Sequence, residues 1–295
     1  MEKSYLITIF TPTYNRAYTL TRLYNSLLTQ TYKDFEWLII DDGSMDNTQQ
    51  LIQSFIDENI ITICYYKQEN GGKYRAVNKG IKLAKGELFF IVDSDDYLAD
   101  NAIERVLFHY ENIKNNKEFA GVCGNKAYFS GKKVGGEVNY SVLDCNSFDF
   151  RYKHKIKGDM AEVFKTDILK QFPFPKIENE IFISESIVWN KIAEKYKLRY
   201  FNENIYFCEY LQYGLSAQSV KLRKNNSQGA TLLYSEMLKY NIPYIQKIKA
   251  AINFWRFAPY AKKLSFSAKL KKIGFFMSAI ALPVGWLMYL NDKRY

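Results

Sequence analysis

Residue types that build metal and redox centres are scarce in this chain. Only two of its 295 residues are histidines, and neither has a partner at zinc-site spacing, so a zinc centre is not expected. The four cysteines lie far apart and form no Cys-x-x-Cys pair, which favours reduced structural thiols in a cytoplasmic setting. The N-terminus lacks a basic segment followed by a long apolar stretch, so we expect no secretory signal.

Two common phosphate-binding motifs are also missing. No Gly-x-Gly-x-x-Gly sequence follows the first apolar run, and the chain has no Gly-x-x-x-x-Gly-Lys loop. A glycine-rich helix N-terminus is therefore not the main holder of a bound phosphate. Any phosphate would need another partner, such as a metal bridge.

Acidic residues are almost absent from the last fifth of the chain. Residues 237–295 contain 11 Lys or Arg and one acid, Asp292, whereas the preceding residues carry 30 of each sign. The whole net charge of +10 therefore lies in this tail. Uniform basicity would suggest nucleic acid, but a neutral body with a basic tail favours an anchor at an anionic surface. We predict no nucleic-acid partner.

The first hundred residues alternate between buried-strand and amphipathic-helix patterns. Strands are predicted at 6–10, 37–40, 60–66 and 88–92. Helices are predicted at 19–28, from Asp46 or Asn47 onward, and at 74–84. This order predicts an α/β fold with a mostly parallel sheet flanked by helices. Ligands bind such sheets beyond the carboxyl ends of the strands.

The patterns are weaker in the remainder of the chain. Residues 118–156 suggest strands and loops without a clear period, and residues 228–290 are helical throughout. Between these regions we predict a strand at 160–164, a helix at 184–196 and one or two strands within 198–207. The chain is predicted to divide into a first domain, 1–225, and a basic, apolar helical region, 226–295.

Three carboxylates follow the fourth predicted strand within four residues, in Asp93-Ser94-Asp95-Asp96. Like charges at this density repel and are costly to desolvate. A hard cation such as Mg²⁺ or Mn²⁺ would make them tolerable and would hold a substrate's phosphates. A solvated acidic turn is the alternative. Polar loops also follow the other three strands, which favours a binding edge. These loops are Thr11–Arg16, Asp41–Ser44 and Asn70–Arg75.

Four ordered motifs carry a family resemblance over roughly residues 5–210. They are Phe-Thr-Pro-Thr-Tyr-Asn-Arg at 10–16, Ile-Ile-Asp-Asp-Gly-Ser at 39–44, Asn-Gly-Gly at 70–72 with Asn-Lys-Gly at 78–80, and Val-Asp-Ser-Asp-Asp at 92–96. With this spacing the chain closely resembles family 2 glycosyltransferases. The resemblance implies a GT-A fold with a Rossmann-like nucleotide-binding half and a nucleotide-sugar donor.

The resemblance implies how the matching residues would bind the nucleotide, usually a uridine diphosphate. Thr11, Pro12 and Thr13 would line the base and ribose pocket. Asp42 would accept a hydrogen bond from the nucleoside. Lys73 would approach the nucleotide from the Gly-Gly turn.

The resemblance also implies roles for the loop Asp93–Asp96, called here the acidic loop, in binding the metal and the ribose. Asp93 would face the ribose, and Ser94 would join the nucleotide-sugar site. Asp95 would bind Mn²⁺ or Mg²⁺, which neutralises charge on the departing diphosphate. Asp96 is either a third ligand or a hydrogen-bond acceptor.

An inverting transfer also needs a base for the attacking hydroxyl. The family places a carboxylate at the start of a helix, often as Glu-Asp; here Glu185 is followed by Ser186, so Glu185 is the predicted base. The alternative is a first-turn acid favoured by the helix dipole. Asp159 is the second candidate for the base. The resemblance places it near the donor sugar and the acceptor, and the alternative is a turn residue before a strand.

The basic tail predicts membrane association. Five lysines between positions 262 and 272 precede Ile273–Leu290, which is 18 residues without a charge. This length is near the lower limit of roughly 17–25 residues for a spanning helix. Because Pro283 and Gly285 interrupt it, an interfacial helix pair on an anionic membrane is favoured over a span. The alternatives are a buried hairpin and an oligomer interface.

These observations together predict an inverting, metal-dependent hexosyltransferase of bacterial cell-surface polysaccharide synthesis. Its donor would be a UDP-sugar, and its acceptor a glycan, carried on polyprenyl diphosphate. It would be a peripheral or monotopic protein at the inner face of the plasma membrane. A nucleotidyltransferase would usually show a Gly-rich signature that is missing here. A catalytically impaired sugar-nucleotide sensor or scaffold is weakly favoured by Ser186 and disfavoured by the intact Asp93-x-Asp95.

Overall fold

The computed structural model describes residues 5–210 and 218–293, which fold into two compact units. The sheet unit comprises Met1–Pro173 and Lys195–Glu209. The helical unit comprises Phe174–Glu194 and Tyr210–Tyr295. The predicted division between residues 225 and 226 stays a prediction.

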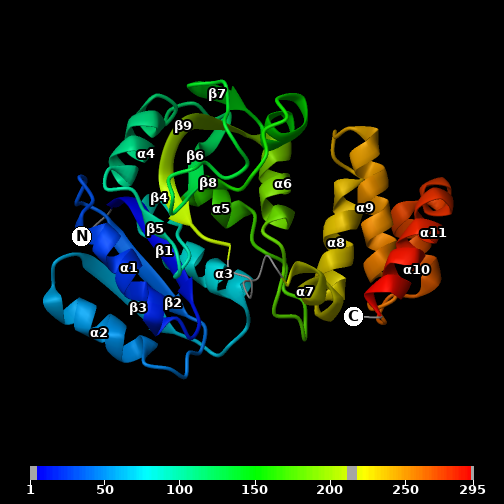
Figure 1. The fold of residues 1–295 in the computed structure, drawn as a ribbon, viewed down its shortest axis with the longest axis horizontal. Helices are drawn as coiled ribbons and strands as arrows, with labels where there is room; N and C mark the ends of the chain where they lie inside the picture. Colours follow the sequence, from blue (N-terminus) through cyan, green and yellow to red (C-terminus); the bar gives the residue numbers. More distant parts are fainter. Residues whose placement is uncertain (1–4, 211–217, 294–295) are drawn as a thin grey trace. The chain divides into compact units, whose positions relative to one another are not determined.

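Nine strands of the described residues form one mixed sheet, in the order β3-β2-β1-β4-β8-β6-β9-β5, with β7 beside β9 (Figure 1). β1 pairs in parallel with β2 and β4, and β2 with β3, whereas β8 runs antiparallel to β4 and β6. The predicted α/β fold with a mostly parallel sheet is therefore confirmed. The strands are β1 (Tyr5–Thr13), β2 (Glu36–Asp41), β3 (Thr62–Lys67), β4 (Gly86–Ile91), β5 (Tyr97–Leu98), β6 (Phe119–Tyr128), β7 (Val142–Cys145), β8 (Met160–Lys165) and β9 (Lys197–Cys208).

The helices of the sheet unit follow the predicted strand–helix alternation. They are α1 (Ala17–Leu28), α2 (Thr48–Glu58), α3 (Lys73–Leu83), α4 (Ala102–Glu111) and α5 (Thr166–Gln171), with a short π-helix at Asp149–Lys153. The four early strands and the helices between them confirm the predictions for this region. The stretch predicted as one or two strands within 198–207 is the single strand β9.

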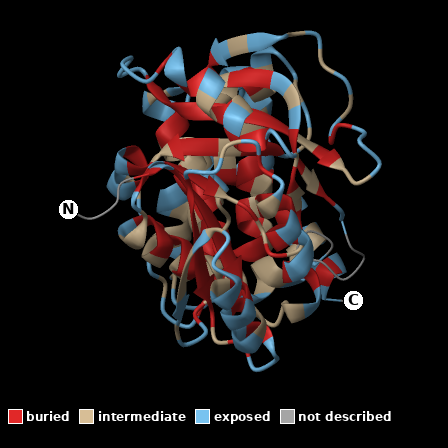
Figure 2. Ribbon diagram, turned by 90° about the vertical axis from the view of Figure 1, so that its left-hand side faces the viewer, coloured by how far each residue is buried: buried red, intermediate tan, exposed pale blue. Residues whose placement is uncertain are grey.

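The central strands are buried because the sheet is covered on both faces, as the red segments in Figure 2 show, whereas the edge strand β3 has no buried residue. Every residue of β2 is buried, and only Leu6 in β1 is exposed. Gly80 lets α3 lie close to β1, since a Cβ there would stand 2.2 Å from the Phe10 ring. This close approach positions the start of α3, and with it Lys73, against the sheet.

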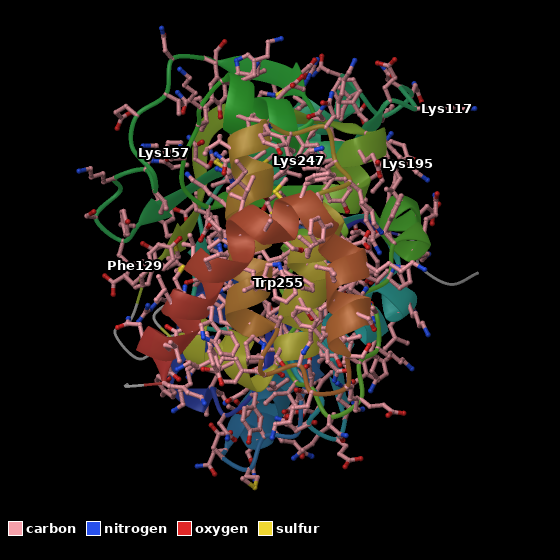
Figure 3. The ribbon with its side chains drawn as sticks, turned by 90° about the vertical axis from the view of Figure 1, so that its right-hand side faces the viewer. Lys117, Phe129, Lys157, Lys195, Lys247 and Trp255 are labelled. Atoms are coloured by element: carbon pink, nitrogen blue, oxygen red, sulfur yellow. The ribbon has the colours of Figure 1, made fainter. Side chains whose placement is uncertain are left out.

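The described helical unit contains α6 (Ser186–Lys195, whose last residue belongs to the sheet unit), α7 (Ser219–Asn225), α8 (Ser227–Met237), α9 (Tyr244–Phe257), α10 (Phe266–Ile273) and α11 (Phe275–Asp292). This agrees with the helical pattern predicted for residues 228–290. α9 and α11 pack along each other. The indole N–H of Trp255, labelled in Figure 3, donates to Ser278 Oγ at 3.3 Å, and Arg256 forms a two-pronged ion pair with Asp292 at 2.7 and 2.8 Å.

Within residues 5–210 and 218–293, no helix is by itself long and apolar enough to cross a membrane. α10 and α11 meet these criteria only as a pair, and their axes differ by 113°.

The Arg256–Asp292 ion pair should stabilise the α9–α11 contact in a pH-dependent way. The hydrogen bonds from Arg256 hold the pKa of Asp292 below its ordinary value of 3.8. The stabilisation is therefore complete above that pH and is lost as the pH falls through the lower folded-state pKa. We expect Asp292→Asn to lower the free energy of unfolding by about 2 kcal/mol at pH 7, with a smaller difference in strong acid. Urea unfolding at both pH values, with exposed Asp167→Asn as the control, measures this difference.

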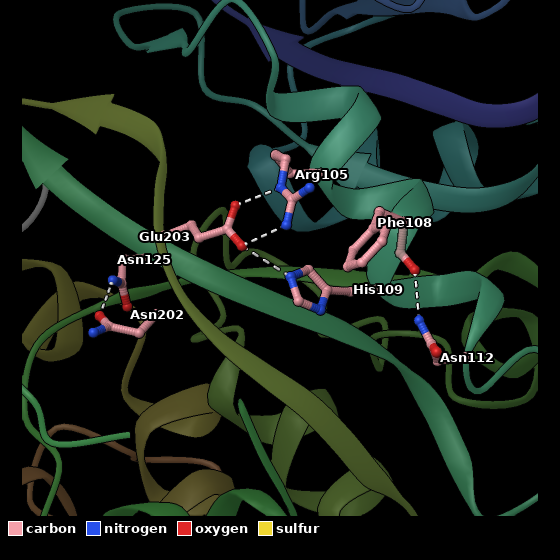
Figure 4. Close-up of polar contacts among 7 residues, drawn as sticks. All are labelled: Arg105, Phe108, His109, Asn112, Asn125, Asn202 and Glu203. Atoms are coloured by element: carbon pink, nitrogen blue, oxygen red, sulfur yellow. Dashed lines mark hydrogen bonds and ion pairs between the residues drawn. The ribbon is translucent and has the colours of Figure 1, made fainter. Parts of the chain in front are cut away.

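A carboxylate on β9 connects α4 to the sheet through hydrogen bonds (Figure 4). Glu203 accepts hydrogen bonds from Arg105 at 2.6 and 2.9 Å and lies 3.0 Å from His109 Nε2. Arg105 and His109 are four residues apart, so they lie on one face of α4. The hydrogen bonds from Arg105 lower the pKa of Glu203. Because this cluster belongs to the packing of α4, it explains one of the two histidines without a metal role.

Candidate functional site

The loops that follow the four parallel strands β1–β4 are joined by hydrogen bonds at one edge of the sheet. The amide of Asp42 donates to the Thr13 carbonyl at 2.8 Å, which ties the β2 loop to β1. The amide of Asn15 donates to Ser44 Oγ at 2.8 Å. Parallel strands bring their carboxyl ends together, and these contacts join the loops after β1 and β2 at that edge.

Asp42 organises the Gly-Gly turn at this edge. Its buried carboxylate accepts hydrogen bonds from the amides of Gly71 and Gly72, at 3.0 and 2.7 Å, and from the Gln68 side chain at 2.7 Å. Gly72 has φ +91°, a conformation that favours glycine, and directly precedes α3. The predicted nucleoside-binding residue thus also fixes the turn from which Lys73 begins the helix.

Removing this carboxylate should loosen the turn. We expect Asp42→Ala to weaken UDP binding by about tenfold or more, because the amides of both glycines lose their acceptor. Gln68→Ala is the matched control, since it removes one of the three contacts and leaves the turn's amides bonded to Asp42. Isothermal titration of both variants with UDP compares the losses. Equal affinities for wild type and Asp42→Ala would contradict this role.

The three residues predicted to line the base and ribose pocket end β1 and are all buried. Thr11 Oγ1 accepts a hydrogen bond from the Trp37 indole at 2.9 Å, so this side chain also holds β1 to β2. Pro12 pairs with Ile40 in the sheet register. Thr13 Oγ1 is buried and has no hydrogen-bond partner among the described residues. An unsatisfied buried hydroxyl is costly, and a bound ligand could satisfy it.

The acidic loop after β4 is faced by cations. Lys73 Nζ lies 2.6 Å from Asp93 Oδ1, and Arg16 lies 3.8 Å from Asp95 Oδ2. Burial acts to raise the pKa of Asp93, but the charge of Lys73, then that of Lys126, outweighs it and holds this pKa below its ordinary value. About a third of the side-chain surface of Asp95 is exposed, at 34%. Of the two ion pairs of this loop, the one between Asp95 and Arg16 is therefore the longer.

Tyr206 of β9 holds the acidic loop in place from the neighbouring part of the sheet. Its hydroxyl donates to Asp96 Oδ2 at 2.6 Å and accepts from the Asp93 amide at 3.0 Å. Lys126 of β6 lies over the ring of Tyr206, 4.0 Å from its centre. Burial and the charge of Asp93 raise the pKa of Asp96 to about 7, although the hydrogen bond from Tyr206 opposes the shift. Asp96 thus has a hydrogen-bond partner in the fold, which favours the acceptor alternative over the third-ligand alternative.

The oxygen donors at this edge suit a hard divalent cation. Asp95 and Asp93 supply carboxylate oxygens, which Mg²⁺ and Mn²⁺ prefer. Within residues 5–210 and 218–293, no group of three or more His, Cys, Asp or Glu side chains is arranged to hold a metal ion. Further oxygen ligands would have to come from water or from the phosphates of a substrate. Ser94, between the two carboxylates, is buried.

The two predicted acceptor-side carboxylates lie in different units. Asp159 is exposed and directly precedes β8 in the sheet unit. Glu185 is half-buried in the helical unit, and its carbonyl accepts from the amides of Val188 and Trp189 at 2.9 and 3.0 Å. Glu185 therefore directly precedes α6, as predicted, whereas the acidic loop belongs to the sheet unit.

Sequence reasoning did not single out Tyr206, Lys126 and Gln68, which contact or face the predicted site residues. Each is a lone polar residue in or just after a strand, without a motif around it. A period-two pattern in β9 would show that Tyr206 is buried, but not that its hydroxyl reaches the acidic loop.

Comparisons with known proteins agree on one family. The model described as glycosyl transferase family 2 matches residues 8–169. The uncharacterized glycosyltransferase RT0329 of Rickettsia typhi is 40% identical over 122 residues, which are 40% of this chain and 36% of the relative. The chain thus matches less than half the length of this relative. WfgD of Escherichia coli, a UDP-Glc:alpha-D-GlcNAc-diphosphoundecaprenol beta-1,3-glucosyltransferase, is 28% identical over 222 residues, 75% of this chain and 81% of the relative.

A solved structure supports the fold independently. TarS residues 1–349 from S. aureus, in complex with UDP-GlcNAc, match with a TM-score of 0.66 and 17% identity. The match covers 98% of this chain and 89% of TarS 1–349. At this identity the likeness establishes the shared fold.

Proposed function

The chain belongs to glycosyl transferase family 2, and from this premise we propose that it moves a hexose from a UDP-sugar to a hydroxyl of a glycan, with inversion at the anomeric carbon. The observation that carries the proposal is the acidic loop after β4. Its carboxylates lie beside Lys73 and Arg16. The Gly-Gly turn and the end of β1 lie at the same edge of the sheet. Carboxylates and cations together suit a metal-bound diphosphate.

The proposed donor site is built by residues of the sheet unit. The buried hydroxyl of Thr13, with Thr11 and Pro12, supports a base and ribose pocket at the end of β1. Asp42 fixes the Gly-Gly turn, and Lys73 at the start of α3 brings a cation to the nucleotide. Backbone and side chain are thus positioned before the donor binds, which lowers the ordering cost of binding.

Asp95, with Asp93 beside it, is proposed to hold Mn²⁺ or Mg²⁺ together with the donor, and Ser94 is proposed to contact the nucleotide-sugar. Such an ion, when bound, neutralises charge on the departing diphosphate. Lys73 and Lys126 add fixed positive charge on the same side. Because Lys73 is paired with Asp93 and Lys126 lies over the Tyr206 ring, they need little reorganisation as the leaving group gains charge.

Glu185 is proposed as the base of the transfer. It would take the proton of the acceptor hydroxyl while that oxygen attacks the anomeric carbon. The bond from the anomeric carbon to the diphosphate oxygen breaks, and its electron pair leaves with UDP. One new glycosidic bond replaces one sugar–phosphate bond. Asp159 is proposed to bind the donor sugar or the acceptor, and it is the second candidate for the base.

The acceptor is proposed to be a glycan on a polyprenyl-diphosphate carrier, in bacterial cell-surface polysaccharide synthesis. Support comes from WfgD, whose name describes a sugar on such a carrier as its acceptor. A lipid-linked acceptor places the reaction at the inner face of the plasma membrane. The enzyme would then be a peripheral or monotopic cytoplasmic protein, consistent with its basic C-terminal region.

A panel of UDP-sugars tests the proposal. We expect slow release of free UDP from one donor in the presence of Mn²⁺ or Mg²⁺, with faster release when the correct acceptor is added. Tight UDP-sugar binding without turnover in any combination would instead support a sensor or scaffold, the alternative that Ser186 favours. Release of inorganic pyrophosphate from a nucleoside triphosphate and a sugar phosphate would indicate a nucleotidyltransferase.

A further inference from the structure

Helix α11 has its large apolar side chains outside and its small ones inside. Every exposed residue of α11 before Asn291 is apolar. The most exposed are Phe276 at 85%, Phe275 at 69% and Leu287 at 66%. The other exposed members of this surface, called here the apolar face, are Ala279, Ile280, Pro283, Val284, Trp286 and Leu290. A helix that packs only into its own protein normally shows the opposite distribution.

The inner side of α11 is fixed on α9 by small and polar residues. Gly285 lies so close to α9 that a Cβ there would stand 2.6 Å from the Ile252 carbonyl oxygen. Ser278 contacts Trp255 near one end of α11, and Asp292 pairs with Arg256 at the other. These contacts run the length of the helix. They hold its orientation, so that the apolar face is presented outward within the helical unit.

Cations flank the apolar face. Lys271 and Lys272 are exposed in the last turn of α10, which ends at Ile273, and Lys262 is exposed in the turn before α10. Lys293 is exposed after the last residue of α11. Between Met237 and Asn291 the sequence has no acid. The apolar face therefore has an entirely basic border within this segment, which complements anionic headgroups.

We propose that the apolar face of α11 inserts into the headgroup–acyl boundary of an anionic bilayer, with the helix axis parallel to the membrane surface. Insertion of this kind buries an apolar helix face about 5–10 Å deep. A membrane span by α11 is disfavoured because one side of this helix packs on α9. α9 carries Arg256 and two lysines, the half-buried Lys247 and the exposed Lys249.

A second copy of this chain is a poorer occupant of the same face. A twofold pairing would bring two sets of like-charged lysines together, whereas an anionic surface would neutralise them. The docking surface refines the membrane location proposed above. It is nonetheless independent of the transfer reaction, because it is argued from the helical unit alone.

Vesicle binding by the full chain tests the inference. Of the four tryptophans, all in the described part of the chain, only Trp286 is exposed. We expect sedimentation with phosphatidylglycerol-containing vesicles and a blue shift of Trp286 fluorescence, with much weaker binding to pure phosphatidylcholine. The shift should disappear in Trp286→Phe. Leu287→Glu should weaken partitioning by about tenfold, because a charge enters the acyl boundary.

Two further variants separate the contribution of the lysines to vesicle binding from that of the apolar face. Replacing Lys262, Lys271 and Lys272 with glutamine should weaken binding on the order of 100-fold at low salt, about fivefold for each charge. Ile60→Glu is the matched control, because Ile60 is an exposed apolar residue of the sheet unit, and it should bind vesicles like the wild type. Thermal unfolding of each variant verifies that it folds.

The inference is overturned if the wild type stays in the supernatant with anionic vesicles, or if Leu287→Glu binds as well as the wild type. A concentration-dependent dimer that Leu287→Glu dissociates, without vesicle binding, would assign the face to a second copy. UDP release from a soluble donor in the absence of vesicles measures the activity of the transfer site separately. Loss of vesicle binding with that release intact, or the reverse, shows which proposal has failed.

Discussion

Asp95→Ala is expected to reduce metal-dependent UDP release by about a thousandfold, which corresponds to the loss of a charge-stabilised leaving group. The carboxylate of Asp95 is a third exposed and its nearest cation is 3.8 Å away, so it contributes little to the fold. The residue is therefore free to serve a ligand. Its replacement should leave the melting temperature unchanged, because no short hydrogen bond is lost.

The measurement compares UDP release with Mn²⁺ binding in the presence of UDP, followed by electron paramagnetic resonance. Both should fall together in Asp95→Ala. Asp167→Ala is the control, since it removes a carboxylate that is 91% exposed in the same unit. Full activity of Asp95→Ala would refute the proposed metal ligand, whatever the effect on stability.

Glu185→Gln is expected to slow transfer to the acceptor by about 10²–10⁴-fold, because the amide cannot take the proton of the hydroxyl. Glutamine keeps the shape of the side chain, and the backbone carbonyl of Glu185 still accepts from the first turn of α6. UDP-sugar affinity should therefore stay at the wild-type value. Transfer rates and donor affinity are measured on the same preparation.

Asp159→Asn provides the comparison that decides between the two carboxylates. If Asp159 binds a sugar and Glu185 is the base, Asp159→Asn raises KM and leaves a measurable kcat, whereas Glu185→Gln lowers kcat. The reverse split would make Asp159 the base. Wild-type transfer rates in both variants would exclude a base role for either residue.

Local patterns predicted most of the sheet and the candidate site. Apolar runs predicted β1, β2 and β4, because parallel strands covered on both faces are largely apolar, and a similar run predicted the less buried edge strand β3. The polar loops that end these strands contain Asp42, Lys73 and the acidic loop, so their meeting at one edge followed from the topology. Hydrogen bonds between these loops show that edge in the structure.

Contacts between distant parts of the chain could not be predicted in this way. Tyr206 reaches the acidic loop across a sequence separation of 110 residues. The helical unit likewise includes residues 174–194, because Glu180 accepts from the amides of Gln228 and Gly229 at the start of α8, both at 2.7 Å. No periodicity signals that a buried glutamate will cap a helix 48 residues later. These pairings depend on how the whole chain packs.

The balance of charges around the acidic loop has a thermodynamic consequence. Three carboxyl groups, those of Asp93, Asp95 and Asp96, face three cations, Arg16, Lys73 and Lys126, and at pH values above the Asp96 pKa of about 7 their charges cancel. A divalent ion entering alone would upset this equality, and so would a diphosphate entering alone. Together their charges largely cancel, so each should raise the other's affinity by the same factor. Titration of the free enzyme with Mn²⁺ should therefore release little heat until UDP is present.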